Sequence, residues 1–326
     1  MVEMRELTTK ARPRVTDELV MRVAGHLTER DRRILRLLAD HRVLTTDHIR
    51  DVFFDHLNTA QHRLTLLHQM RLVDRFRRLD GGYATGPYHY VLDQLGAMVI
   101  AAERDRDLDT VRWRRDKAFA ISDSQRLAHH LGVNGFFCAL LRHARHTSGA
   151  RLWHWWSERR ITDWLLKVVH PDGWGRWEEA GRSVGFFLEY DRGTEPLDRL
   201  VAKLEGYADV EVGTGQLEWI LFWLPSQRRE ANVRAAMAGA TVPLATAAGS
   251  LGRPPAEAVW WPMGHPRPRR RLAELADVPK PPEAFIRRAR RQAERLQPEQ
   301  GEVTHATTTP PAGDDADPAD PEEDWG

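Results

Sequence analysis

The chain has 326 residues, with 48 Lys and Arg, 47 Asp and Glu, and a single cysteine. This length suits two domains better than one. A hydrophobic fraction of 41% with 12 tryptophans excludes global disorder. A mean hydropathy of −0.55, with no apolar run of about 18 residues, excludes a membrane-spanning helix. We expect a cytoplasmic protein, because no signal segment opens the chain and lone Cys138 excludes an internal disulfide or a cysteine-clustered zinc site.

Charge is distributed unevenly along the chain. Residues 298–326 contain nine acidic residues and no Lys or Arg, whereas residues 1–297 carry 48 basic and 38 acidic residues, a balance of +10. A basic body with an acidic tail indicates a polyanionic partner, which the tail would screen. A purely solubilising tail is the alternative reading of the same composition.

The first predicted elements are helices with recognisable start signals. Residues 1–26 show no periodic signal, and we predict a flexible lead-in there. Thr28 resembles the start of a capping box and predicts a helix ending near residue 41. Thr45 or Thr46 opens a second short helix, and Asn58 opens a third that runs to about residue 70.

A hairpin is predicted after these helices. Residues 73–79 and 88–92 have strand character and flank a Gly81-Gly82 turn. Three helices followed by a hairpin is the order of a winged helix-turn-helix, which we predict over residues 27–110.

A winged helix of this kind binds double-stranded DNA, because its third helix fits the major groove and its hairpin contacts phosphates. On the third helix Gln suits adenine, Arg suits guanine, and Thr suits a base or a phosphate. The candidate DNA-binding residues are His62, Arg63, Thr65 and Gln69 on the helix, and Arg75, Arg77 and Arg78 on the hairpin. The alternatives are ordinary solvated faces and a winged helix that contacts another protein.

A second domain is predicted over residues 120–248 with the element order α-β-β-β-α-β-α-β. Its first helix begins at Asp123 or Ser124, and its second begins at Pro196. The predicted strands are 151–156, 168–177, 183–191, 219–224 and 242–246, with a last helix at 227–237. A Pro-rich and basic helical extension follows at 249–297, and residues 298–326 have the composition of a disordered tail.

Carboxylates mark the strands of this second domain. Asp172 lies inside the strand predicted at 168–177, and Glu189 and Asp191 end the next strand. The apolar run before Glu189 indicates a central strand, where an ionised carboxylate is costly unless a cation accompanies it. Asp172 and Glu189 are therefore candidates for holding Mg²⁺, which would support phosphodiester hydrolysis. The alternatives are that Asp172 is a turn residue and that Glu189 and Asp191 form structural ion pairs with nearby arginines.

Residues 124–246 resemble the PD-(D/E)xK nuclease superfamily. The resemblance rests on the element order and on Pro171-Asp172 with Glu189-Tyr190-Asp191. It implies an endodeoxyribonuclease with Asp172, Glu189 and Asp191 in the site. The family pattern has a lysine where this chain has Asp191, and Lys203 on the following helix is the best substitute.

The chain from residue 27 to about residue 246 also resembles the replication-relaxation family of actinobacterial plasmids and integrated elements. The resemblance rests on runs such as Leu27-Thr28-Glu29-Arg30-Asp31 and Phe187-Leu188-Glu189-Tyr190-Asp191-Arg192-Gly193-Thr194-Glu195. It implies a DNA-binding protein connected with replication or relaxation.

Three functions therefore stay open for this α+β chain. The first is a Mg²⁺-dependent nicking enzyme, the second a non-catalytic DNA-binding regulator or replication accessory, and the third a protein-interaction adaptor. We interpret His129 and His130 as packing and surface residues. Trp153, Trp155, Trp156 and Trp164 could stack on unpaired bases, but aromatic density near strands more often marks a core. The oligomeric state is open, a homodimer being one alternative.

Overall fold

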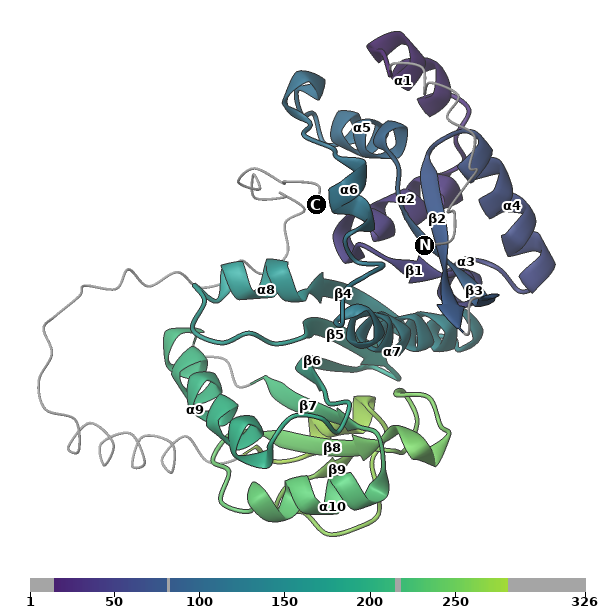
Figure 1. The fold of residues 1–326 in the computed structure, drawn as a ribbon. Helices are drawn as coiled ribbons and strands as arrows, with labels where there is room; N and C mark the ends of the chain where they lie inside the picture. Colours follow the sequence, from purple (N-terminus) through teal and green to yellow (C-terminus); the bar gives the residue numbers. More distant parts are fainter. Residues whose placement is uncertain (1–14, 81–82, 215–217, 281–326) are drawn as a thin grey trace, which may run out of the picture. The chain divides into compact units, whose positions relative to one another are not determined.

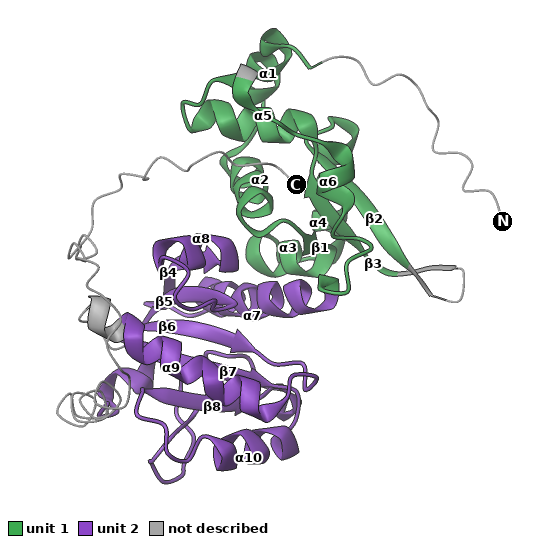
Figure 2. Ribbon diagram, turned by 60° about the vertical axis from the view of Figure 1, so that its left-hand side comes forward, with its two compact units in different colours: residues 1–127, 320–326 green, residues 128–319 purple. Residues whose placement is uncertain are grey.

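The computed structural model describes residues 15–80, 83–214 and 218–280 (Figure 1). These residues form two compact units: the first takes in the described residues up to Leu127, and the second begins at Ala128 (Figure 2). Each unit combines helices with one β-sheet, so the predicted α+β class is confirmed. No helix in the described ranges is both long enough and apolar enough to cross a membrane.

The first unit places helices around a small antiparallel sheet with the strand order β1-β3-β2. Its elements in chain order are α1 (Asp17–Ala24), α2 (Glu29–His41), β1 (Leu44–Thr45), α3 (Thr46–Phe53), α4 (Leu57–Gln69), β2 (Val73–Asp80), β3 (Tyr83–Leu92), α5 (Gln94–Glu103), η1 (Leu108–Thr110) and α6 (Arg115–Phe119).

Side-chain caps explain where the helices of the first unit begin. Asp31 N donates to Thr28 Oγ1 at 3.3 Å, and Asp31 Oδ2 accepts from Thr28 N at 2.9 Å, which completes the predicted capping box of α2. Thr45 caps α3 by accepting from the backbone N–H of His48 at 3.1 Å. The predicted cap at Asn58 is wrong, because α4 already begins at Leu57.

Helix α1 departs from the lead-in predicted for residues 1–26. Thr16 accepts from Leu19 N at 3.3 Å and caps the helix, and Val20 is fully buried. Eight residues are too few for a periodic signal to stand out, so the sequence did not reveal this helix. Residues 1–14 and the predicted Gly81-Gly82 turn lie outside the described residues.

The second unit is a six-stranded sheet covered on both faces. Its elements are α7 (Leu127–His146), β4 (Arg151–Ser157), α8 (Glu158–Trp164), β5 (Gly173–Glu179), β6 (Arg182–Tyr190), α9 (Leu197–Thr214), β7 (Trp219–Leu224), α10 (Gln227–Ala236), β8 (Leu244–Ala248), η2 (Gly249–Leu251), β9 (Trp261–Pro262) and η3 (Ala273–Asp277). The strand order is β4-β5-β6-β7-β8-β9. Strands β6, β7 and β8 run parallel, and the remaining pairs are antiparallel.

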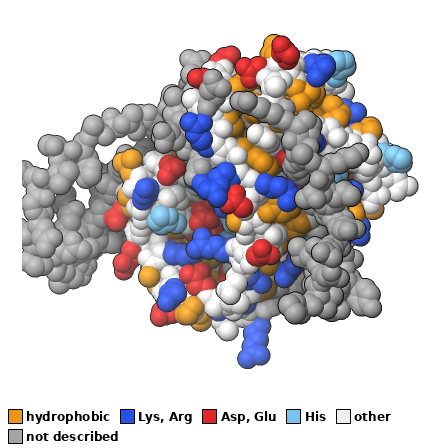
Figure 3. All heavy atoms as spheres, turned by 45° about the horizontal axis from the view of Figure 1, so that its top comes forward, with side chains coloured by type: hydrophobic (Ala, Val, Ile, Leu, Met, Phe, Trp, Pro, Cys, Tyr) orange, Lys and Arg blue, Asp and Glu red, His pale blue; other side chains and the backbone are white. Residues whose placement is uncertain are grey.

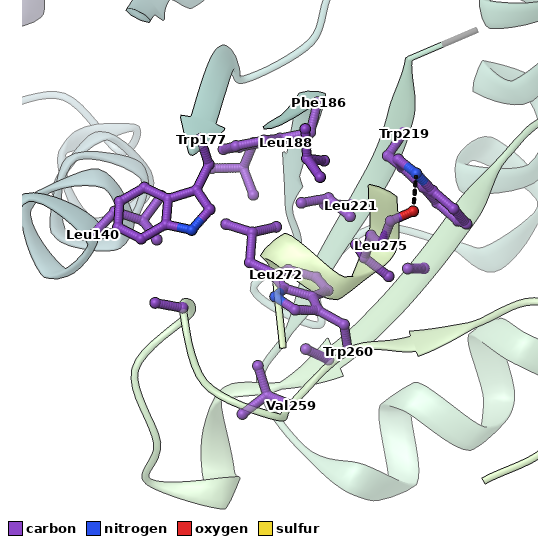
Figure 4. Packing of buried hydrophobic residues seen from close by; sticks show 14 of the residues in the cluster. Leu140, Trp177, Phe186, Leu188, Trp219, Leu221, Val259, Trp260, Leu272 and Leu275 are labelled. Atoms are coloured by element: carbon purple, nitrogen blue, oxygen red, sulfur yellow. Dashed lines mark hydrogen bonds between the residues drawn. The ribbon is translucent and has the colours of Figure 1, made fainter. Parts of the chain in front are cut away.

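Strand β6 divides its side chains between two cores, because successive residues point to opposite faces of a sheet. Phe186 and Leu188 pack in the core that contains α7, whereas Phe187 packs in the core that contains residues of α8, α9 and α10. Figure 4 shows part of the first core. Burial on both faces explains the continuous apolar run in the sequence of this strand.

The Pro-rich segment after β8 completes the first of these cores. Trp260, Leu272 and Leu275 are fully buried there, and Trp219 Nε1 donates to the carbonyl oxygen of Leu275 at 3.1 Å (Figure 4). Up to residue 280 this segment therefore belongs to the sheet domain rather than to a separate extension. Residues 281–297, where a basic helix is predicted, and the acidic tail at 298–326 lie outside the described residues.

Two further details differ from the prediction. Helix α8 was not expected between the first two strands. Strand β5 begins at Gly173, so Asp172 lies just before the strand instead of inside it. The predicted hairpin turn between β5 and β6 is confirmed, since Glu179 pairs with Arg182. Ala180 and Gly181 make the turn with φ values of 53° and 74°.

Candidate functional site

The antiparallel pairing of β5 and β6 brings the two predicted carboxylates next to each other. Gly173 pairs with Leu188, so the same register places Asp172 opposite Glu189 at the end of β6. Asp172 N donates to the carbonyl oxygen of Leu188 at 3.0 Å, which carries the pairing one residue beyond β5. Two acids that are 17 positions apart in the chain thus share one end of the strand pair.

Glu189 is buried among polar partners. Its side chain is 2% exposed, Oε2 lies 2.8 Å from Lys203 Nζ, and Oε1 accepts from the Tyr207 hydroxyl at 2.5 Å. Burial and then the negative charge of Asp172 raise the pKa of Glu189 to about 7, although Lys203 and Tyr207 act in the opposite direction. This carboxyl group therefore exchanges a proton near neutral pH.

Lys203 reaches this carboxyl group from α9, as the sequence predicts. Its amine also lies 3.2 Å from Glu195 Oε2. Burial alone would lower the pKa of Lys203, but the acids around the amine, Glu189 first among them, outweigh burial and raise it above its ordinary value. The Lys203 amine therefore stays positively charged beside the carboxyl groups of Glu189 and Glu195.

His129 is a member of the site that sequence reasoning missed. It lies in the first turn of α7, and its Nε2 is 2.8 Å from Asp172 Oδ1, while the backbone N–H of Tyr190 donates to Asp172 Oδ2 at 2.7 Å. Burial would lower the pKa of His129, but Asp172 outweighs burial and raises it. The ring also meets Tyr190 edge-on, at 5.9 Å between centroids. No local motif marks this pairing, which joins positions 43 residues apart.

Asp191, the residue at the expected lysine position, has a different set of partners. Its Oδ2 lies 2.7 Å from Arg229 Nε of α10, and its Oδ1 accepts from the backbone N–H of Gly193 at 2.7 Å. Arg229 in turn donates to the carbonyl oxygen of Glu195. Asp191 thus holds the segment that follows β6, and this segment supplies Glu195 to the Lys203 amine.

The donor set at this site fits a hard cation with few protein ligands. Over the described ranges, no three His, Cys, Asp or Glu side chains are placed so as to hold a metal ion. Mg²⁺ commonly needs only one or two carboxylates, because water and substrate phosphate supply its remaining oxygens. Asp172 and Glu189 offer such a pair, and the high pKa of Glu189 indicates a carboxyl group that a nearby cation would help to ionise.

In the first unit, α4 exposes part of the predicted DNA-binding set. His62 and Gln69 are exposed, and half-buried Thr65 donates its hydroxyl to the carbonyl oxygen of Gln61 at 2.8 Å. Ala60, Leu64 and Leu67 face the core, as the spacing predicts. The outer face of α4 therefore carries exposed His62 and Gln69 together with Leu66, which is 47% exposed.

Arg63 has a structural partner that its sequence position did not reveal. Its Nε donates to Asp31 Oδ1 at 2.7 Å, and a second guanidinium nitrogen contacts Asp31 Oδ2. Asp31 is fully buried, and the Arg63 bond contributes to lowering the pKa of Asp31 against the effect of burial. Arg63 thus joins α4 to α2.

The hairpin carries cations on an aromatic support. The guanidinium groups of Arg75 and Arg77 lie 4.1 Å and 3.9 Å from the ring centroid of Tyr88. Arg77 and Arg78 are exposed, and Arg75 is half-buried. On the face drawn in Figure 3, Lys and Arg side chains lie interspersed with Asp and Glu side chains.

Comparison with known proteins identifies the family of the chain. The replication-relaxation family profile matches residues 35–218. The chain belongs to the replication-relaxation family. This membership confirms the resemblance noted from the sequence and links the chain to replication or relaxation of plasmids or mobile elements. No curated protein and no solved structure shows significant similarity to it.

Proposed function

We propose that this replication-relaxation protein binds double-stranded DNA through its first unit, as a winged helix. The order α2-β1-α3-α4-β2-β3 with a three-stranded antiparallel sheet supports this proposal. Helix α4 enters the major groove with His62, Thr65 and Gln69, and the hairpin arginines contact phosphates. Arg63 supports α4 through Asp31 and is not needed to read bases.

We also propose that the second unit is a nuclease-like domain of the PD-(D/E)xK type that nicks DNA. The observation that carries this proposal is the Lys203 amine 2.8 Å from Glu189, on the strand pair whose register sets Asp172 opposite Glu189. Mg²⁺ held by Asp172 and Glu189 would supply an activated water and a clamp on the phosphate.

The side chains of this chain have separate tasks in the proposed hydrolysis. A water oxygen bonds to phosphorus, the bond from phosphorus to the leaving sugar oxygen breaks, and that oxygen takes a proton. The Lys203 amine offsets the charge that develops on the phosphate. Asp172 raises the pKa of His129, so the ring is more often protonated and can donate a proton at the edge of the site. Asp191 keeps the segment after β6 in place through Arg229.

A second candidate function is DNA binding without cleavage. The observation in its favour is that Asp191 stands where the PD-(D/E)xK pattern has a lysine, and that Asp191 forms an ion pair with Arg229. In that case Lys203 serves only to neutralise Glu189, and the chain acts as a regulator or replication accessory. A protein-interaction adaptor is the third alternative, and the absence of any DNA binding would favour it.

Nicking of a supercoiled plasmid tests the enzymatic proposal. We expect wild-type protein with Mg²⁺ to convert the plasmid to the open circular form, and Asp172→Asn to slow this conversion by a factor of about 100 or more. Arg182→Ala is the matched surface control, since Arg182 pairs with Asp277 at the opposite end of β6 from Glu189. Intact plasmid with the wild type across Mg²⁺ and Mn²⁺ would leave only the non-catalytic alternative.

A salt titration of duplex binding tests the winged-helix proposal. Because each phosphate contact contributes about −0.9 to the slope of log affinity against log salt, Arg75→Ala with Arg77→Ala should reduce the slope by about 2. Arg114→Ala is the control, since exposed Arg114 already pairs with Asp116. No duplex binding by the wild type at low salt would contradict the proposal.

A further inference from the structure

An aromatic surface lies beside the carboxylates on strands β4 and β5 and on α8. It comprises Trp153, His154, Trp156, Trp164 and Trp174. The ring of Trp174 lies 4.7 Å from that of Trp156 and 5.5 Å from that of His154, and Trp164 meets Trp156 edge-on at 6.0 Å. Trp174 pairs with Phe187, and Phe187 lies two residues before Glu189 on β6, so Trp174 and Glu189 are on the same face of the sheet.

Guanidinium groups accompany these rings. Arg151 lies 3.5 Å from the ring centroid of Trp153, and Arg160 lies 4.7 Å from that of Trp156. Arginine stacked on an aromatic ring is held in a fixed direction while its remaining N–H groups can contact a phosphate. The surface therefore combines flat apolar rings with oriented positive charge.

Two tryptophans of this aromatic surface are exposed to solvent, whereas Trp156 and Trp174 are half-buried and pack against the core that contains residues of α8, α9 and α10. Trp153 and Trp164 are 45% and 39% exposed, whereas Trp177 and Trp260 are fully buried. Strand β4 is also the edge of the six-stranded sheet. The core interpretation is confirmed for Trp155, which stacks on buried Phe137 at 5.0 Å, and for half-buried Trp156, but it is wrong for Trp153 and Trp164.

An exposed apolar segment adjoins the same helix. Leu166 and Val168, just after α8, are 81% and 51% exposed. Leu166 and Lys167 both have left-handed backbones, with φ values of 52° and 64°. Non-glycine residues rarely adopt this conformation, and such strain is often kept where a segment contacts a ligand.

We propose that the aromatic surface binds unpaired DNA. Bases stack on the exposed rings of Trp164 and Trp153, while Arg160 and Arg151 contact phosphates of the same strand. The strand would then pass the Asp172 and Glu189 carboxylates. This inference rests on the proposed function for its substrate, and it specifies the class as single-stranded or locally opened DNA. A protein partner would require an exposed apolar surface but would not require arginines stacked on Trp153 and Trp156, so these contacts favour DNA over a protein.

Binding of a fluorescent 20-nucleotide oligothymidine to the full chain, in EDTA, tests the proposal. We expect Trp164→Ala to weaken oligonucleotide binding by about fivefold or more, because stacking on one aromatic ring contributes at least that much. Arg160→Ala should also weaken it, because it removes a phosphate contact. Trp164→Phe, which keeps a ring, should retain most of the affinity. Arg182→Ala should bind like the wild type, and none of these variants should change the affinity for duplex DNA at the first unit.

The outcomes separate this inference from the proposed hydrolysis. No oligonucleotide binding by the wild type, or equal binding by wild type, Trp164→Ala and Arg160→Ala, would overturn the inference even if plasmid nicking occurs. Oligonucleotide binding that depends on Trp164 in a protein that nicks nothing supports the surface and overturns only the hydrolysis. If Trp164→Ala instead converts a dimer to a monomer in sedimentation and leaves oligonucleotide binding intact, the surface joins two copies and the inference is wrong.

Discussion

Two buried glutamates at the ends of neighbouring strands have opposite electrostatic environments. Glu179 ends β5, and its Oε1 lies 2.8 Å from Arg271 and 3.1 Å from His143, so its pKa falls below its ordinary value although burial acts to raise it. Glu189 lies near the end of β6, faces Asp172, and has its pKa raised to about 7.

The difference teaches how to separate a structural ion pair from a candidate site in this sheet. Glu179 has a guanidinium and an imidazole as partners and no acid among the groups that shift its pKa. Glu189 shares the Lys203 amine with Glu195 and faces Asp172, whose own partner is the His129 ring. An acid pair with too little positive charge destabilises the fold, and such arrangements are kept mostly where chemistry uses them.

The largest effect should come from neutralising the two glutamates in turn. Glu179→Gln should lower the free energy of unfolding by about 2 kcal/mol, because Arg271 and His143 lose the buried carboxylate that they contact, while Arg271 keeps its second partner Glu257. At pH 5, where Glu189 is largely protonated in the folded protein, Glu189→Gln should change it by less than about 1 kcal/mol, because both side chains are then neutral. Urea unfolding of both variants measures this contrast, and equal losses would remove the distinction.

Two arginines of the first unit, Arg63 and Arg77, allow a similar comparison between a structural charge and a DNA-binding charge. Arg63→Ala should cost about 2 kcal/mol of stability because it leaves fully buried Asp31 without its cation. Arg77→Ala should leave stability unchanged and weaken duplex DNA binding. Thermal melting and duplex titration of both variants measure the two roles. An Arg63→Ala variant that keeps wild-type stability and loses only DNA binding would contradict the structural role of Arg63.

The pH dependence of stability should differ in sign between the two glutamates. In metal-free protein the folded state holds the Glu189 proton more tightly than the unfolded chain does, so its contribution is lost as pH rises from about 4.5 to about 7. The lowered pKa of Glu179 has the opposite effect, since its contribution is present above its ordinary pKa and lost as pH falls through the folded value.

Urea titrations at pH 5 and pH 7.5 isolate the Glu189 contribution. Relative to wild type, Glu189→Gln should gain on the order of 2 kcal/mol between the two pH values. Glu179→Gln should show no such gain. A Glu189→Gln variant whose stability follows that of wild type at both pH values would show that Glu189 ionises normally.

The smallest expected effect is stabilisation by Mg²⁺. At a concentration ten times the dissociation constant, Mg²⁺ should add about 1.4 kcal/mol and raise the melting temperature by about 3–5 °C. The increase should be larger at pH 8 than at pH 6, because Glu189 must lose its proton to bind a cation. Asp172→Asn should abolish the increase and Glu179→Gln should keep it.

Much of the fold follows from local sequence signals. The capping box of α2, the start of α3 at Thr45 or Thr46, the turn between β5 and β6, and the apolar run of β6 depend on residues near one another in the chain, and they were predicted. Lys203 was predicted because its place on the helix stripe directs it toward β6. The burial of Trp260 in a Pro-rich segment was not predicted, because composition does not show which distant strand a segment packs against.

The residues that were missed or given the wrong role depend on long-range contacts. His129 reaches Asp172 only because the first turn of α7 lies beside the beginning of β5. Arg63 was predicted to read bases, but its guanidinium group pairs with Asp31, 32 positions away in the chain. In both cases the residue type was compatible with several roles, and the partner decided between them.

The central claim is that Asp172 and Glu189 form a hydrolytic site whereas Glu179 does not. Single-turnover nicking of supercoiled plasmid in Mg²⁺ by wild type, Glu189→Gln and Glu179→Gln tests it most directly. We predict that Glu189→Gln reduces the rate by about 100-fold or more and that Glu179→Gln, at a temperature where it stays folded, nicks at the wild-type rate. Equal rates for wild type and Glu189→Gln would contradict the claim.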